Sequence, residues 1–192
     1  MMSMVILAAG KSTRTPGRNK LLAKVEGVPM IRRVVQTALS SKVDEVIVVV
    51  GWEEEKIRSA IAGINCKVTL NRNFELGQSS SVKAGLAEIN EASSAVLILP
   101  GDVAKIETKS INLVIEKYDR DGYLIVVAGH EGRSGHPILF DKKLFPEIEH
   151  ISEETFGLKA VVKKHQGEVY LVETGSTHVL RDFDTSKDLE EL

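Results

Sequence analysis

An apolar run passes directly into a loop of small residues with four cations near the start of the chain: Leu7-Ala8-Ala9-Gly10-Lys11-Ser12-Thr13-Arg14-Thr15-Pro16-Gly17-Arg18-Asn19-Lys20. The run predicts a buried strand, and the loop after such a strand is where open α/β sheets bind ligands. Glycines 10 and 17 let backbone amides approach an anion closely, and no carboxylate precedes Glu26. We expect a phosphate-binding loop, and the alternative is a solvated basic loop.

Two common phosphate-binding motifs do not fit this loop. Gly10-Lys11-Ser12 matches the end of a Walker A motif, but that motif requires a glycine five residues before Gly10, where the chain has Val5. The Rossmann fingerprint fails as well, because Ser12 stands in place of its second glycine. The loop therefore belongs to another type of phosphate site.

Short apolar runs alternate with segments of helical spacing over the first 128 residues. The alternation predicts a three-layer α/β/α fold with a mainly parallel, Rossmann-like twisted sheet and helices on both faces. The expected strands are Met4–Ala8, Glu45–Val50, Lys67–Leu70, Ala95–Leu99 and Tyr123–Ala128. The expected helices are Met30–Ser40, Glu53–Ala62, Ser79–Ile89 and Thr108–Arg120.

The pattern changes after Gly129, where we expect a glycine-rich turn and then shorter elements. They are a strand near Pro137–Phe140, a helix over Phe156–His165, strands near Glu168–Val172 and Thr177–Leu180, and a last helix capped by Thr185 with Asp188. No proline- or serine-rich linker separates these elements from the preceding part of the chain. We expect one domain over 1–192, with a nucleotide-binding part at 1–128 and an acceptor-side lobe with the C-terminal helix at 129–192.

Composition excludes several classes of protein. The chain has 192 residues, of which 43% are hydrophobic, and a formal net charge of -2. Its overall charge therefore does not attract it to nucleic acid or to an anionic membrane. The single cysteine, Cys66, excludes an internal disulfide framework. No apolar run approaches the roughly 18 residues of a spanning helix, and we expect a cytoplasmic protein without membrane or nucleic-acid partners.

Two further loops follow predicted strands. The polar segment Asn71 to Ser81 offers amides and hydroxyls that could read a nucleobase or ribose, and the alternative is ordinary helix capping by Ser79 or Ser80. Asp102 directly follows an apolar strand, which suits a Mg²⁺ ligand or a turn former. Asp182 or Asp184 could add a second ligand, although Asp184 could also simply precede the last helix.

Covalent and histidine-based metal chemistry find no support in the sequence. His130 and His136 flank a glycine-rich segment without a metal-ligand spacing, and no Gly-x-Ser-x-Gly elbow is present.

Taken together, the loops resemble those of the MobA-like nucleotidyltransferases, most closely the molybdopterin cytidylyltransferases. That family opens with Leu-Ala-Ala-Gly-x-Ser-x-Arg-Met-Gly-x-x-Lys, which Leu7 to Arg14 match and, after a slightly longer insertion, Lys20. Four later segments match in the family's order: Gly77-Gln78-Ser79-Ser80-Ser81-Val82-Lys83-Ala84-Gly85-Leu86, Pro100-Gly101-Asp102, Gly135-His136-Pro137-Ile138-Leu139-Phe140 and Asp182-Phe183-Asp184-Thr185.

The resemblance implies transfer of CMP from CTP to a phosphorylated acceptor, most closely molybdopterin, with release of pyrophosphate and with Mg²⁺ as cofactor. It also implies a transient contact with a molybdoenzyme or its chaperone. It assigns Arg14, Lys20 and Asp102 to catalysis, Arg14 and Lys20 by contact with the triphosphate and Asp102 by binding Mg²⁺. The other implied roles are base and ribose contacts from Leu7, Ala8, Ala9 and Gly10, base contacts near Gly77, Ser80 and Ser81, a second metal ligand at Asp184, and an acceptor-side His136.

The sequence leaves alternatives open for the base of the nucleotide donor, for the acceptor and for whether the protein is catalytically active. The pair Ala8-Ala9 and the segment Gly135-His136-Pro137 resemble the cytidylyl branch of the family more than the guanylyl branch. Guanylyl transfer, a methylerythritol-phosphate or sugar-phosphate acceptor, and a nucleotide-binding regulator without turnover are the other readings. An acceptor phosphate is already an anion near neutral pH, so the transferase needs alignment and charge stabilisation rather than a strong base.

Overall fold

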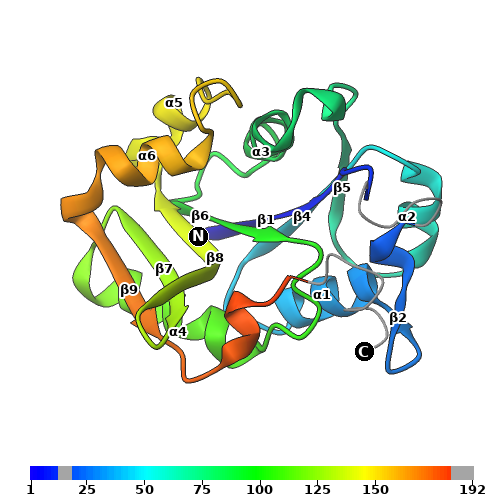
Figure 1. Ribbon diagram of the computed structural model, residues 1–192, viewed down its shortest axis with the longest axis horizontal. Coiled ribbons are helices and arrows are strands. Elements are labelled where there is room, and N and C mark those ends of the chain that lie inside the picture. The colour runs from blue at the N-terminus through cyan, green and yellow to red at the C-terminus, as the bar shows by residue number, and fades with distance from the viewer. Residues whose placement is uncertain (13–18, 183–192) are drawn as a thin grey trace.

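A seven-stranded sheet forms the centre of the protein. The computed structural model describes residues 1–12 and 19–182, and the strand order is β5-β4-β1-β6-β8-β7-β9 (Figure 1). Four neighbouring pairs are parallel, and β8 is antiparallel to both of its neighbours. The bounds are β1 Met2–Ala8, β4 Glu45–Val50, β5 Lys67–Leu70, β6 Ala95–Pro100, β7 Ile125–His130, β8 Arg133–Asp141 and β9 Val169–Glu173.

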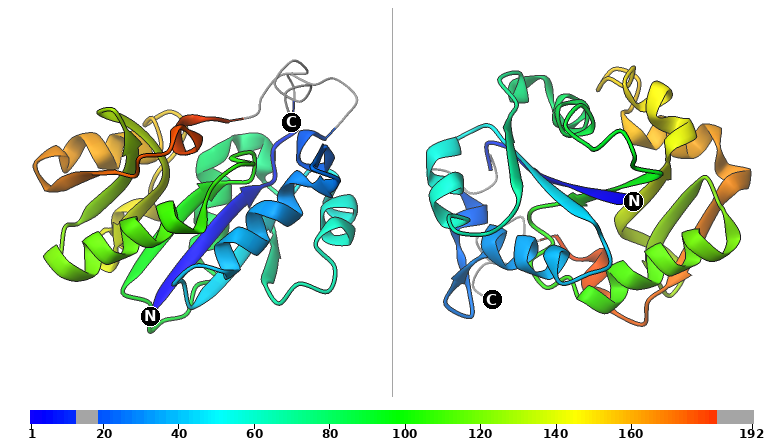
Figure 2. Two further views of the ribbon diagram at one scale, coloured as in Figure 1. Left: turned by 90° about the horizontal axis from the view of Figure 1, so that it is seen from below. Right: turned by 180° about the vertical axis from the view of Figure 1, so that it is seen from behind.

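Helices cover both faces of this sheet, as the additional views in Figure 2 show. One face carries α1 (Met30–Leu39), α2 (Glu54–Ala60) and α4 (Thr108–Asp121), and the other carries α3 (Gln78–Leu86), α5 (Phe145–Ile148) and α6 (Leu158–Lys164). This arrangement confirms the predicted three-layer α/β fold with a mainly parallel sheet. The smaller elements are the hairpin β2 (Lys24–Val25) and β3 (Val28–Pro29) and the 3-10 turns η1 (Lys20–Leu22), η2 (Phe74–Leu76), η3 (Lys142–Leu144), η4 (Gln166–Glu168) and η5 (Thr177–Leu180).

The alternation of side chains along β1 divides the core into two layers. Met4 and Ile6 belong to the cluster under α1 and α4, whereas Val5 belongs to the cluster under α3. Helix α3 approaches the sheet closely at Gly85, where an added Cβ would lie 2.3 Å from Cγ1 of Val5. The absence of a side chain at this position therefore sets how near α3 lies to β1.

The reversed strand β8 brings a later part of the chain to the edge where β6 ends. The last register pair between these strands joins Ile98 to Ile138. Two residues further along each strand, β6 ends at Pro100 and β8 carries His136. Antiparallel pairing thus places His136 at the same edge of the sheet as the loop that begins with Gly101.

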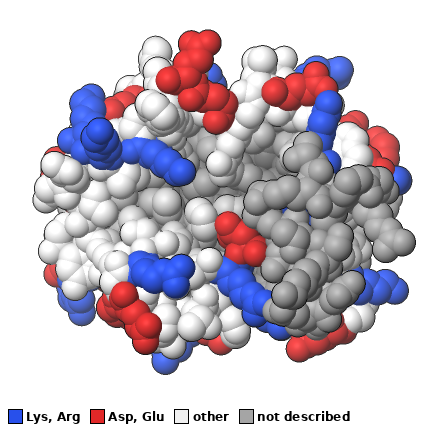
Figure 3. Space-filling view, viewed as in Figure 1, with Lys and Arg blue, Asp and Glu red and all other residues white. Residues whose placement is uncertain are grey.

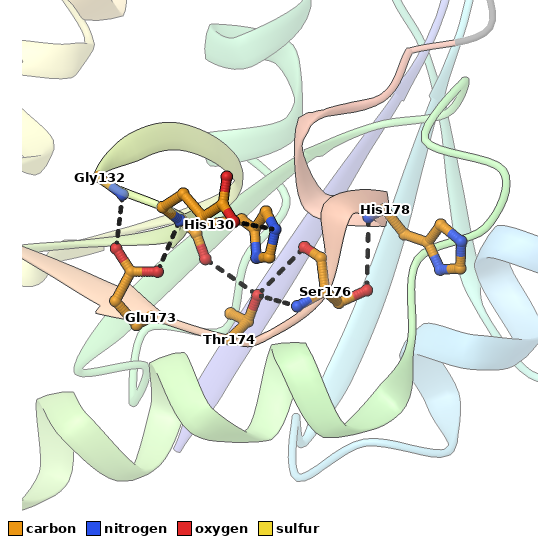
Figure 4. Close-up of polar contacts among 8 residues, drawn as sticks. His130, Gly132, Glu173, Thr174, Ser176 and His178 are labelled. Atoms are coloured by element: carbon orange, nitrogen blue, oxygen red, sulfur yellow. Dashed lines mark hydrogen bonds and ion pairs between the residues drawn. The ribbon is translucent and has the colours of Figure 1, made fainter.

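The turn from β7 to β8 is tight and is held from β9 (Figure 4). Glu131 and Gly132 both have positive φ, and their backbone N–H groups donate to the two carboxylate oxygens of Glu173 at 2.9 and 2.8 Å. The Thr174 hydroxyl donates to the Gly129 carbonyl at 3.0 Å. The expected glycine-rich turn is therefore shorter than predicted, because β8 already begins at Arg133.

Two predictions for the second half of the chain are wrong in detail. Residues 177–180 form a 3-10 turn instead of a strand, because the Ser176 side chain caps the N–H of His178 and Val179 packs against β8. The expected helix over 156–165 begins only at Leu158, since Phe156 and Gly157 both have positive φ. The expected last helix, with Thr185 and Asp188, lies outside the described residues.

Within the described residues, no helix is long and apolar enough to cross a membrane.

Candidate functional site

A cleft of about 1150 Å³ opens at the edge of the sheet where the parallel strands end. Its walls come from the ends of β1 and β6, the start of α3, the first residues of β8, and the segment from 151 through α6. Most of the residues assigned from the sequence line this one cleft: Leu7, Ala9, Gly10, Lys20, Gly77, Ser81, Asp102 and His136.

Two assigned residues that the structure describes, Ala8 and Ser80, are not among those that line the cleft. Ala8 is buried in the core under α1, and the Ser80 hydroxyl donates to backbone carbonyls of Asn73 and Gly77. Arg14 and Asp184 lie outside the described residues. The roles of all the assigned residues in binding and catalysis stay predictions, including those of the residues that line the cleft.

Lys20 and Asp102 form an ion pair across the cleft, and each side chain is only 15% exposed. Asp102 follows β6 in a loop that is tied to β1, because the N–H of Gly101 donates to the Leu7 carbonyl at 2.9 Å. Lys20 begins η1, where its own N–H donates to the Ser12 hydroxyl at 3.2 Å. That bond joins the two described ends of the loop that follows β1.

Three buried polar atoms of cleft-lining residues have no hydrogen-bond partner among the described residues. They are Oδ1 of Asp102, Nδ1 of His136 and the hydroxyl oxygen of Ser79. Burial lowers the pKa of His136, and the negative charge of Asp102 acts in the opposite direction. The imidazole is therefore neutral near pH 7 and can donate or accept one hydrogen bond toward a ligand.

Helix α3 begins at the cleft and is capped from the opposite wall. A carboxylate oxygen of Glu153 accepts a hydrogen bond from the N–H of Ser79 at 2.7 Å. The Ser79 hydroxyl is buried without a described partner, and the Ser81 hydroxyl accepts from the Asn71 amide at 3.0 Å. Ser79 and Ser80, the two expected caps, lie inside α3, because the helix begins at Gln78 and its N-cap residue is Gly77. Neither serine therefore acts as the N-cap.

The sequence reasoning missed a group of cleft residues on the far wall. Glu153, Phe156, Lys159 and Lys163 all line the cleft. No motif marks them, and their place depends on β8 turning back along β6. The available signal was the pair Lys159 and Lys163, which lie four residues apart on a short amphipathic segment and therefore on one side of a helix.

The sequence comparison identifies a family over most of the chain. The model of the MobA-like NTP transferase domain matches residues 4–169. A curated relative, the bifunctional protein GlmU of Neisseria meningitidis, is 32% identical over 116 residues, which is 60% of this chain and 25% of that protein. The chain thus spans about a quarter of the length of this relative.

Solved structures share the fold along the whole chain. A nucleotidyl transferase from Methanothermobacter superposes with a TM-score of 0.86 and 21% identity, covering 100% of this chain and 95% of that one. The complex of Rv0371c from Mycobacterium tuberculosis with manganese superposes with a TM-score of 0.79 and 23% identity, covering 100% and 97%. At these identities the likeness establishes the fold.

Proposed function

The chain belongs to the MobA-like NTP transferase family, and from this premise we propose that it transfers CMP from CTP to a phosphorylated acceptor of the molybdopterin type, with Mg²⁺ as cofactor. An oxygen of the acceptor phosphate attacks the α-phosphorus of CTP. The bond from the α-phosphorus to the bridging oxygen of the β-phosphate breaks, and pyrophosphate leaves. The acceptor brings its own negative charge, since the second pKa of a phosphate monoester is about 6.

One observation carries this proposal: a lysine and an aspartate from different strand ends meet in the cleft, and the aspartate keeps one buried oxygen unused. The Lys20 ammonium lies against Asp102, and Oδ1 of Asp102 has no described partner. Lys20 can exchange its contact with the carboxylate for a phosphate oxygen of the nucleotide, where its charge stabilises the transition state.

The donor set at this position fits a hard divalent cation. Carboxylate oxygen is the ligand that Mg²⁺ prefers, and Asp102 offers one that is buried and unpaired. Among the described residues no group of three or more histidine, cysteine or acidic side chains could hold a metal. Asp102, with the predicted Asp184 and oxygens of the nucleotide, would therefore hold Mg²⁺. When bound, the ion would neutralise charge on the triphosphate.

The remaining cleft residues position the two substrates. Backbone at Ala9 and Gly10 lies at the end of β1 and can approach the nucleotide closely, while Ser81 and the start of α3 offer hydrogen bonds to its base. The proposal of CTP over GTP rests on the pair Ala8-Ala9 and the segment Gly135-His136-Pro137. We assign His136, which lines the cleft, to the acceptor side.

The test is pyrophosphate release from CTP with molybdopterin by the wild type and by Asp102→Asn. We expect the variant to lose at least about 100-fold in kcat/KM, the scale for removing one transition-state stabilising group. Asp119→Asn makes the same change of charge at an exposed position of α4 and serves as the matched control. Activity of Asp102→Asn equal to that of the control would remove Asp102 from the mechanism.

A second measurement separates the proposed donor and acceptor from their alternatives. Binding of CTP, GTP, ATP and UTP by calorimetry in the presence of Mg²⁺ should favour CTP. Binding of GTP alone would overturn the cytidylyl assignment. Binding of CTP with no pyrophosphate release for any phosphorylated acceptor would instead indicate a nucleotide-binding protein without turnover.

A further inference from the structure

One side of α6 faces the cleft and carries two lysines. Lys159, Val162, Lys163 and Gln166 line the cleft, and their spacing of three, four and seven residues places them on one side of the helix and its continuation. Val161 lies on the other side and is buried in the core. Figure 3 shows basic side chains that extend inward from the region of α6 at the upper left of the molecule.

These two lysines differ from the other described lysines of the cleft in having no acidic partner. Lys11 pairs with Glu75 and Lys20 pairs with Asp102. Over residues 1–12 and 19–182, no carboxylate lies within ion-pair distance of Lys159 or Lys163. Two like charges four residues apart repel each other on a helix, and a bound anion would relieve that repulsion.

An exposed aromatic side chain lies next to this pair in the same wall. Phe156 is 78% exposed and has a φ of 63°, a backbone conformation that is uncommon for a residue other than glycine. The following Gly157 donates its N–H to the Ser152 carbonyl at 2.8 Å, and Glu153 ties the segment to α3. The fold therefore holds a large apolar ring at the cleft, where it can stack on a flat ligand.

We propose that Phe156, Lys159 and Lys163 form the acceptor subsite, and that this subsite takes a ligand that combines a flat heteroaromatic ring with a phosphate. The inference rests on the proposed transferase function. All three residues follow residue 128, whereas Lys20 and Arg14, which the triphosphate would contact, belong to the loop after β1. The two substrates would then enter from opposite walls and meet at Asp102.

Direct binding tests this subsite without turnover. The probes are a pterin monophosphate, which has a flat ring and a phosphate, and glucose 1-phosphate, which has a phosphate and no flat ring. Wild-type protein should bind the pterin probe at least tenfold more tightly. The double variant Lys159→Gln with Lys163→Gln should lose at least tenfold for both probes. Phe156→Ala should lose at least tenfold for the pterin probe alone.

Lys164→Gln is the matched control, because Lys164 lies on the same helix but pairs with Glu147 at 3.1 Å. It should bind both probes as the wild type does, and all variants should bind CTP with unchanged affinity. The proposal is overturned if the double variant binds the probes normally, if it loses CTP binding instead, or if Phe156→Ala retains the preference for the pterin. Normal probe binding without pyrophosphate release would contradict the transferase function alone.

Discussion

Replacing Gly85 by alanine should destabilise the protein and weaken nucleotide binding together. The added Cβ would lie 2.3 Å from Cγ1 of Val5 and 2.9 Å from Cγ2 of Val49, both of which are fully buried. Carbon atoms prefer a separation of about 3.5–4.0 Å, so α3 must move outward by about an ångström or the valines must leave their preferred rotamers. Such overpacking costs about 1–3 kcal/mol.

Part of that cost is offset, because alanine is favoured over glycine within a helix by about 1 kcal/mol. The net loss is then as much as about 2 kcal/mol, and a loss of that size lowers Tm by about 4–8 °C for a chain of this length. Outward movement of α3 also displaces Ser81 from the cleft, so CTP should bind more weakly. Thermal unfolding followed by circular dichroism, together with calorimetry of CTP binding, measures both effects.

Gly167→Ala is the matched control, since nothing lies within 4 Å of a Cβ at this position and its φ is not in the left-handed region. Its Tm should stay close to that of the wild type. If Gly85→Ala is as stable as Gly167→Ala, the close approach of α3 to β1 is not needed for stability and the reasoning fails.

Two further predictions concern the contacts that hold the rim of the cleft and the end of α4. Glu153→Ala removes the acceptor for the N–H of Ser79 and should lower the free energy of unfolding by about 1 kcal/mol. Glu153→Gln keeps an acceptor and should lower it less. Equal Tm values for the two variants would contradict a capping role. Burial and the hydrogen bond to Asp141 raise the pKa of Tyr118 above its usual value, so the folded state binds this proton more tightly than the unfolded state. This stabilisation is complete below the unfolded pKa of about 10 and is lost as pH rises above it. Between pH 9 and 11 the free energy of unfolding, measured with urea, should therefore fall less for Tyr118→Phe than for the wild type. An equal fall in the two proteins would refute the assignment.

The first half of the fold follows from its sequence because the signals there are local. The strands at Glu45–Val50 and Lys67–Leu70 have the predicted bounds, since near-continuous apolar or β-branched runs between helical segments are typical of a buried parallel sheet. Asp102 follows β6, so its place at the common edge of the parallel strands could be expected. Lys20 reaches the same edge from η1, where its N–H is bonded to Ser12, and pairs with Asp102.

The second half depends on tertiary contacts that no local pattern reports. Residues 177–180 carry the β-branched Thr177 and Val179 two positions apart, which suits a strand. They lie against β8 so closely that a Cβ on Gly135 would be 2.1 Å from the Val179 carbonyl oxygen. That packing leaves room for a 3-10 turn and not for another strand at this position. Phe156 was expected inside a helix, yet its left-handed backbone delays the helix by two residues.

The position of β8 has a consequence for how this protein can move. Because β8 is hydrogen-bonded to β6 on one side and to β7 on the other, the strands beneath the cleft belong to one continuous sheet. A hinge that swings the two walls apart would have to break main-chain bonds in the middle of the sheet. We therefore expect any adjustment to substrates to come from side chains and loops at the rim of the cleft, over a sheet that keeps its shape.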